Sequence, residues 1–140
     1  MRRLTHLGGA PLTIGTGLGL LAYDRRLGAA ALLANAGSHV VVQLLKRTVA
    51  RARPCDVHGR PLALVHLPDP HSFPSGHAAA ATAVAVTVAI AHPLAAPLAL
   101  PLAALVAYSR VALRVHHVSD VLAGVALGLA GAIGASVLLR

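Results

Sequence analysis

The chain is built from long apolar blocks joined by short polar stretches. Five blocks stand out, at residues 7–22, 27–45, 76–92, 94–109 and 118–139. A helix needs about 20 apolar residues to cross the hydrocarbon core of a bilayer, with about 17 as the lower limit. The second and fifth blocks meet this length, the third lies at the limit, and the first and fourth are shorter. The pattern predicts an all-α fold: a polytopic transmembrane helical bundle of about five spans.

The connections predict how these helices are joined. Only His92 and Pro93 separate the third and fourth blocks, which indicates a tight antiparallel hairpin. Residues 46–75 form one long connection that is too polar for lipid, and such loops are usually functional or mobile. A short interfacial helix within residues 62–67 is compatible with its sequence. At 140 residues, the chain is expected to be a single domain, 1–140.

Composition supports the membrane assignment. The chain is 56% hydrophobic and 11% charged, whereas soluble domains are usually about 25% charged. The basic start followed by an apolar stretch has the outline of a signal peptide, but no clear cleavage site follows, so we interpret it as a retained span. The Ala-rich composition, with Arg preferred over Lys, suggests a bacterial source. We therefore expect an integral protein of a bacterial cell membrane.

The net charge of +8 narrows the classes of partner. Basic chains bind nucleic acid, anionic membrane surfaces or anionic substrates. With three aromatic residues and no recognisable binding module, nucleic acid is not expected as a partner. The single Cys55 excludes an internal disulfide and any cysteine-based metal cluster.

Two helical faces carry distinctive residues. On the second block, Asn35, His39 and Gln43 recur every four residues and therefore share one face. That stripe either satisfies interhelical hydrogen bonds in the interior or forms the floor of an active site. The last block repeats small residues, beginning with Gly124 and Gly128, which let another helix approach closely. Packing within the bundle is the simpler interpretation; a homo-oligomer contact through this helix is the alternative.

Three polar clusters lie at the ends of the predicted spans. With five spans, the end of the second, the start of the third, the end of the fourth and the start of the fifth share one membrane face. The topology alone therefore gathers the clusters at one face. Basic residues are also more numerous on this side, which by the positive-inside rule favours a cytoplasmic site.

The first cluster runs from Lys46 to Arg53 and Pro54. Basic residues at a membrane boundary often extend toward lipid headgroups. The alternative is a phosphate clamp, because guanidinium groups bind two phosphate oxygens at once and Lys adds a point charge.

The second cluster, Phe73-Pro74-Ser75-Gly76-His77, opens the third span. Ser75 is a typical N-cap residue. The start of a helix offers unpaired N–H groups and a positive dipole end to an anion. Gly76 lets the backbone approach that anion, and His77 lies within reach of it.

The third cluster contains Ser109, Arg110, His116 and Asp120. A carboxylate four residues after a histidine can hold its Nδ1–H and leave Nε2 free as a nucleophile. His117 lacks a partner at this spacing and ranks second. No histidine pair has metal-ligand spacing with a third ligand nearby, so neither a metal nor a cofactor is expected. No role follows from the sequence for four histidines: His58, His66, His71 and His117.

Together, Lys-x6-Arg-Pro, Pro-Ser-Gly-His and Ser-Arg-x5-His-x3-Asp resemble the signature of the type 2 phosphatidic acid phosphatase superfamily, over residues 46–128. The resemblance implies a helical bundle, usually of six spans, and metal-independent hydrolysis of phosphomonoesters or pyrophosphates. It implies that His116 is the nucleophile that forms a phosphohistidine, that Asp120 orients it and that His77 protonates the leaving oxygen. The phosphoryl-binding positions implied by the family are Lys46, Arg53, Ser75, Gly76 and Arg110.

The resemblance leaves several functions to weigh. The expected activity is that of a lipid phosphate phosphatase, with phosphatidic acid, phosphatidylglycerol phosphate, an isoprenyl pyrophosphate or a polyprenyl-linked sugar phosphate as substrate. Soluble vanadium haloperoxidases of the same superfamily lack this hydropathy. A transporter would place charges at the bilayer midplane, and a non-catalytic membrane protein with an anion pocket would be expected to lose motif residues. In this sequence the charges cluster at the span ends and no motif residue is lost, which favours the phosphatase and leaves a non-catalytic or transport-type membrane protein as the alternative.

Overall fold

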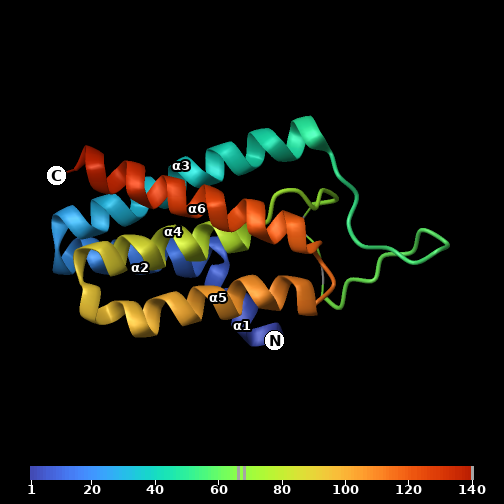
Figure 1. Cartoon of the computed structure of the whole chain (residues 1–140), viewed down its shortest axis with the longest axis horizontal. Coiled ribbons are helices and arrows are strands. Elements are labelled where there is room, and N and C mark those ends of the chain that lie inside the picture. The colour runs from blue at the N-terminus through green and yellow to red at the C-terminus, as the bar shows by residue number, and fades with distance from the viewer. Residues whose placement is uncertain (66, 68, 140) are drawn as a thin grey trace.

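The computed structural model describes residues 1–65, 67 and 69–139 (Figure 1). Within these residues the regular elements are helices, and pairing between extended segments is limited to two isolated bridges. The predicted all-α fold is therefore confirmed. In chain order the elements are α1 (Arg2–Thr5), the 3-10 helix η1 (His6–Gly8), α2 (Ala10–Tyr23), α3 (Arg25–Val49), α4 (Gly76–Ala91), the 3-10 helix η2 (Pro93–Ala95), α5 (Ala96–Ala112) and α6 (Val118–Leu138).

The five apolar blocks correspond to the five long helices, with ends that shift by a few residues. The second block gains two residues at its start because the Asp24 side chain caps α3, accepting hydrogen bonds from Arg26 N at 2.8 Å and Leu27 N at 3.0 Å. Helix α3 ends at Val49, and the next residue, Ala50, has a φ of 47° in the left-handed region. The hairpin between α4 and α5 forms as predicted, with η2 as its turn.

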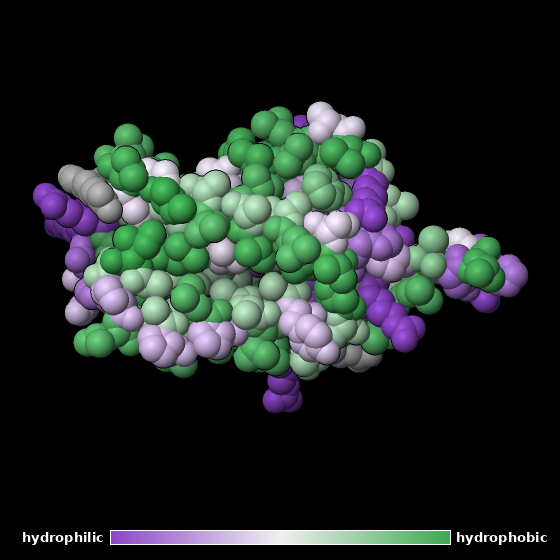
Figure 2. Space-filling view, viewed as in Figure 1, coloured by the Kyte–Doolittle hydropathy of each residue, from purple (hydrophilic) through white to green (hydrophobic). Residues whose placement is uncertain are grey.

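The outer surface of the bundle is apolar. Three helical segments are long and apolar enough to cross a membrane, Arg25–Val49, Pro93–Ala112 and Val118–Leu138, while α2 and α4 are apolar but shorter. Figure 2 shows hydrophobic side chains over the middle of the bundle and strongly hydrophilic residues mainly toward its ends. Large side chains such as Leu94, Leu98 and Leu122 point outward. This pattern fits a bundle whose outer face contacts lipid, as the sequence predicted.

The interior is packed with small residues, as in other membrane bundles. Alanines of α4 fill the centre, and α6 lies directly against them. A Cβ at Gly124 would lie 2.4 Å from the Ser75 carbonyl oxygen, and a Cβ at Gly128 would lie 2.4 Å from that of Ala79. Gly131 faces α3 in the same way. These glycines therefore serve packing within the bundle, and an oligomer contact through α6 stays a prediction.

We expect Gly128→Ala to destabilise the bundle. The added methyl group would meet the Ala79 carbonyl oxygen at 2.4 Å and Thr82 Cβ at 2.8 Å, so α4 and α6 would have to separate. Overpacking of this kind costs about 1–3 kcal/mol. Gly134→Ala is the matched control, because nothing lies within 4 Å of a Cβ at that position of the same helix. Thermal unfolding in detergent should show a lower midpoint for the first variant alone; equal midpoints would contradict this packing.

The connection between α3 and α4 differs from expectation in one respect. Residues 62–65 and 67 are not helical, and residue 66 lies outside the described residues, so the interfacial helix considered for 62–67 does not form. The backbone there is engaged elsewhere: Leu62 N donates to Pro54 O at 3.1 Å, and Leu64 N donates to Leu113 O at 3.1 Å. These bonds hold the connection extended against the bundle end.

Candidate active site

The three polar motifs meet at one end of the bundle. Figure 1 shows the C-terminal end of α3, the start of α4, the end of α5 and the start of α6 at the same end, next to the long connection. A cavity of about 740 Å³ lies there. Its walls include six of the eight site residues predicted from the sequence: Lys46, Arg53, Gly76, His77, Arg110 and His116.

Three cations from separate elements face this cavity. Lys46 belongs to the last turn of α3, Arg53 to the connection and Arg110 to α5. The Arg53 guanidinium is anchored by donation to the Val115 carbonyl oxygen at 2.8 Å. Arg110 donates through one terminal nitrogen to the Thr5 hydroxyl, while its buried Nε has no partner among the described residues. The cluster carries three positive charges, and neighbouring backbone and side-chain acceptors hold its donor groups in place.

The residues at the start of α4 lie at two different places relative to the cavity. Ser75 is fully buried, accepts a hydrogen bond from Ala78 N at 3.4 Å and donates its own N–H to Asp120 O at 2.9 Å. It therefore caps the helix behind the cavity, as its N-cap pattern predicted, and does not line the cavity itself. Gly76 and His77 form the part of this motif that lines the wall.

The N-terminal segment closes the site on the side of His77. A Cβ at Gly8 would lie 2.8 Å from the His77 carbonyl oxygen, and one at Gly9 would lie 3.8 Å from His77 Nε2. The glycines therefore let the chain pass close to the histidine. Thr5, in the same segment, holds Arg110. Gly8 and Ala10 line the cavity, so this segment contributes to the site wall, which the sequence motifs do not indicate.

His116 is held through its Nδ1 atom. Nδ1 lies 2.6 Å from the Ser72 carbonyl oxygen, a geometry in which Nδ1–H donates and Nε2 carries the free lone pair. Asp120 Oδ2 lies 3.8 Å from the same Nδ1. The direct hydrogen bond expected between Asp120 and His116 is therefore replaced by one to a backbone carbonyl.

The reason lies at the start of α6. Asp120 is the third residue of that helix, and its carboxylate accepts the backbone N–H of His117 at 2.8 Å in a capping box. Its other oxygen accepts from Arg51 at 2.9 Å. Asp120 is fully buried, so these two bonds satisfy its charge. It supplies negative charge close to His116 without being its nearest partner.

Burial, together with the positive charges of Arg53 and Arg110, lowers the pKa of His116 to about 3 from 6.5. The imidazole is therefore neutral across the physiological range, as a nucleophile requires. Protonation of His116 should lower kcat/KM at acid pH. Because kcat/KM reports groups of the free enzyme, we expect this decrease near pH 3 and not near pH 6.5. A pH–rate profile corrected for substrate ionisation measures this; a His116 titration near its ordinary pKa would contradict it.

Two charged residues of the site were missed by motif reasoning. Asp69 lines the cavity and pairs with Lys46 at 2.8 Å and Arg53 at 3.1 Å. Arg51 binds Asp120 from outside the motif positions. A signal was present, because the chain has only four acidic residues beside twelve Lys and Arg, and a polar acid in such a sequence is expected beside cations.

The polar stripe of α3 also lines this cavity. Asn35, His39 and Gln43 all border it. Asn35 donates through Nδ2 to the Thr13 hydroxyl of α2 at 3.1 Å, which is an interhelical hydrogen bond, whereas the exposed His39 and Gln43 lie 3.2 Å from each other. A role of the stripe as the floor of an active site stays a prediction. The cavity continues from the cations along α3 toward apolar residues such as Ile14 and Leu32.

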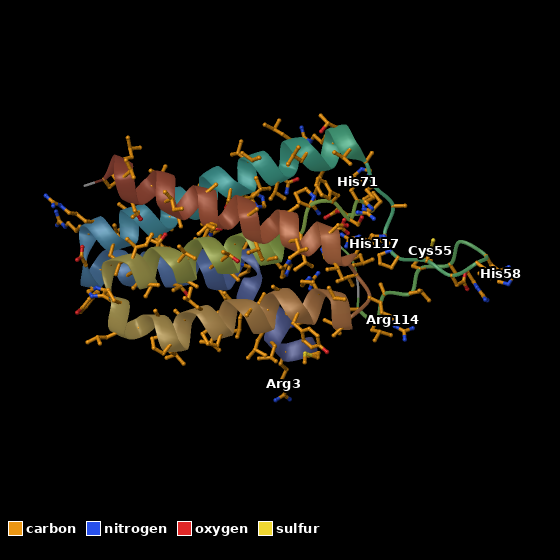
Figure 3. All side chains as sticks on the ribbon, viewed as in Figure 1. Arg3, Cys55, His58, His71, Arg114 and His117 are labelled. Atoms are coloured by element: carbon orange, nitrogen blue, oxygen red, sulfur yellow. The ribbon has the colours of Figure 1, made fainter. Side chains whose placement is uncertain are left out.

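Three of the four histidines without a predicted role, His58, His71 and His117, lie outside the cavity lining. Figure 3 shows His58 near the tip of the connection, and His71 and His117 near its base. His117 precedes α6 as its N-cap, and His66 lies outside the described residues. Across the described part of the chain, no three His, Cys, Asp or Glu side chains are grouped so as to hold a metal ion.

Comparison with known proteins places this geometry in a family. The sequence model of the PAP2 superfamily matches residues 27–140. A curated relative from Mycobacterium tuberculosis, named decaprenylphosphoryl-5-phosphoribose phosphatase, is 43% identical over 100 residues, which cover 69% of this chain and 54% of the relative. The chain thus spans about half the length of the curated relatives that it matches.

Two solved structures share the fold. The transmembrane PAP2-type phosphatidylglycerolphosphate phosphatase of Bacillus subtilis aligns with a TM-score of 0.77 at 31% identity, over 98% of this chain and 73% of that one. LpxE of Aquifex aeolicus aligns with a TM-score of 0.84 at 24% identity, over 96% and 82% of the two chains. With the family model covering most of the sequence, the chain belongs to the PAP2 superfamily.

Proposed function

We propose that this chain is an integral membrane phosphatase that removes the terminal phosphate of a phosphorylated lipid through a phosphohistidine formed on His116. The observation that carries this proposal is one cavity bordered by His77, His116 and the three cations Lys46, Arg53 and Arg110. Phosphoryl transfer depends mainly on positioning and on neutralising charge on the equatorial oxygens. Lys46, Arg53 and Arg110 supply that charge, and the start of α4 adds N–H groups.

The reaction assigns a different task to each histidine. Neutral His116 attacks phosphorus through Nε2, because its Nδ1–H is engaged by the Ser72 carbonyl. The bond from phosphorus to the leaving oxygen breaks, and His77, on the same cavity wall, gives that oxygen a proton. Water then cleaves the phosphohistidine and releases phosphate. The buried Asp120 carboxylate, 3.8 Å from Nδ1, stabilises the positive charge that develops on His116.

The shape of the cavity favours a substrate anchored in the bilayer. Its polar end holds the cations, and it continues between α2 and α3 past Asn35, His39 and Gln43. A lipid tail fits the apolar stretch, while the amide and imidazole groups suit the hydroxyls of a sugar or polyol headgroup. The named activity of the mycobacterial relative is consistent with a polyprenyl-linked sugar phosphate, which we place first among the candidate substrates.

A panel of lipid phosphates tests this function. Purified protein in detergent is given a polyprenyl-linked sugar phosphate, phosphatidic acid, phosphatidylglycerol phosphate and an isoprenyl pyrophosphate, and released phosphate is measured. We expect release from at least one lipid and continued release in excess chelator, because the charge at the site comes from side chains. Absence of release from every lipid would overturn the proposal, and loss of activity in chelator would overturn its metal-free mechanism.

A further inference from the structure

The Asp69 carboxylate bridges two of the three cations of the site. Its Oδ2 lies 2.8 Å from Lys46 Nζ, and its Oδ1 lies 3.1 Å from a terminal nitrogen of Arg53. The Asp69 carbonyl oxygen also accepts from Arg53 Nε at 3.0 Å. The two cationic side chains are 9% and 7% exposed, whereas that of Asp69 is 34% exposed. The carboxylate therefore approaches a nearly buried pair of cations from the solvent side.

The Asp69 carboxylate is an anion that occupies the site where Lys46 and Arg53 would bind a phosphate. Buried charges are costly unless they are paired, and Asp69 pairs both cations within the cavity. Burial alone would raise the pKa of Asp69, but its hydrogen bond to Lys46 and the charges of Lys46 and Arg53 outweigh this and lower that pKa below its ordinary value. The carboxylate is thus ionised and satisfies the same donors that a phosphate would use.

We propose that Asp69 is an internal competitor that occupies the phosphate position until a lipid substrate displaces it. The inference rests on the proposed function, because it assumes that Lys46 and Arg53 bind the phosphoryl oxygens. A lipid phosphate can displace the carboxylate because its tail and headgroup gain further contacts along the cavity. Displacing Asp69 weakens every phosphate ligand by the same factor. The lipid offsets this loss through its further contacts, whereas free inorganic phosphate, including the released product, gains none of them and binds weakly.

Asp69 has a route out of the site. Its partly exposed side chain faces solvent on one side, and its Oδ1 also accepts the backbone N–H of His71 at 3.0 Å. The segment beyond it is fixed separately, since Ser72 N donates to Arg51 O at 2.8 Å and the Ser72 hydroxyl donates to Ala52 O at 2.8 Å. A change of side-chain rotamer at Asp69 therefore removes its carboxylate from both cations, while Arg53 Nε keeps its bond to the Asp69 carbonyl oxygen and Ser72, which holds His116, does not move.

The alternative is that Asp69 only orients Lys46 and Arg53. The two roles predict opposite changes in anion affinity when Asp69 is replaced. Removing a competitor tightens the binding of a phosphate-sized anion, whereas removing an orienting residue weakens it. An internal occupant that fills the site nine-tenths of the time lowers apparent affinity about tenfold.

The test measures binding of inorganic phosphate and vanadate to the full chain in detergent by titration calorimetry, alongside their inhibition of lipid phosphate hydrolysis. We expect Asp69→Asn and Asp69→Ala to tighten both anions about tenfold. Asp56→Asn is the matched control, because this acid of the same connection pairs with Arg60, away from the cavity. This substitution should leave the dissociation constants of phosphate and vanadate unaltered.

Unchanged or weaker anion binding in Asp69→Asn would overturn the inference. The use of two variants guards against a local packing effect, because an orienting role predicts that Asp69→Ala weakens binding more than Asp69→Asn does. Failure of the proposed function appears separately, as wild-type protein that hydrolyses no lipid phosphate. Calorimetry needs no turnover, so it still decides the role of Asp69 in that case.

Discussion

Replacing His116 with Ala should abolish phosphate release from the lipid substrate, with a loss on the order of 10⁴–10⁶ in kcat, the range seen when a nucleophile or its base is removed. The cations and the helix start would still bind the phosphate, but no other group at the site would form the covalent intermediate. Substrate binding should therefore persist while turnover stops. Initial-rate assays and equilibrium binding of the lipid to the variant separate the two.

The matched control for this variant is His58→Ala. His58 lies near the tip of the connection between α3 and α4, well away from the base of the loop (Figure 3), so its loss should leave kcat unchanged. Thermal unfolding of both variants in detergent checks that the bundle is intact. A His116 variant that folds and keeps more than a hundredth of the wild-type rate would remove His116 from the role of nucleophile.

Replacing His77 with Gln should lower kcat by about 10²–10⁴, the usual contribution of a general acid. The loss should depend on the leaving group. A lipid alkoxide needs a proton when its bond to phosphorus breaks, whereas an aryl oxide of low pKa leaves without one. We therefore expect a large defect with the lipid substrate and a much smaller one with an aryl phosphate.

The ratio of the two rates distinguishes proton donation from a structural role. His77 packs under Gly8 and Gly9, so a variant that disturbs this contact would lose activity toward both substrates alike. An equal loss would show that His77 shapes the wall of the cavity and does not donate a proton.

The sequence predicted the fold well, because apolar length decides which segments form membrane helices. It also predicted that the motifs gather at one end, because alternate helix ends must share a face. It failed for the segment 62–67, where hydrophobic content suggested a helix but hydrogen bonds to Pro54 and Leu113 hold the backbone extended. Hydrogen bonds between residues distant in the chain leave no pattern in the local sequence, so the sequence could not predict them.

The same limit explains the details of the site. The spacing of His116 and Asp120 indicated a hydrogen bond between them, but the capping of α6 and the Arg51 side chain use the Asp120 oxygens first. The partner of His116 is instead the carbonyl of Ser72. Backbone carbonyls are present at every residue, so no sequence motif can mark the one that matters. For Asp69, the scarcity of acidic residues indicated a pairing with cations, but not which ones, because the fold brings Lys46 and Arg53 to it.

The account depends most on covalent attachment of phosphate to His116, and one measurement tests this directly. Protein mixed with a lipid substrate labelled with ³²P in its terminal phosphate is quenched in alkali within the first turnover and digested, and the labelled peptide is identified by mass spectrometry. We expect an acid-labile label on the peptide that contains His116, and none in His116→Ala. Label on another residue, or active protein that never becomes labelled, would contradict the account.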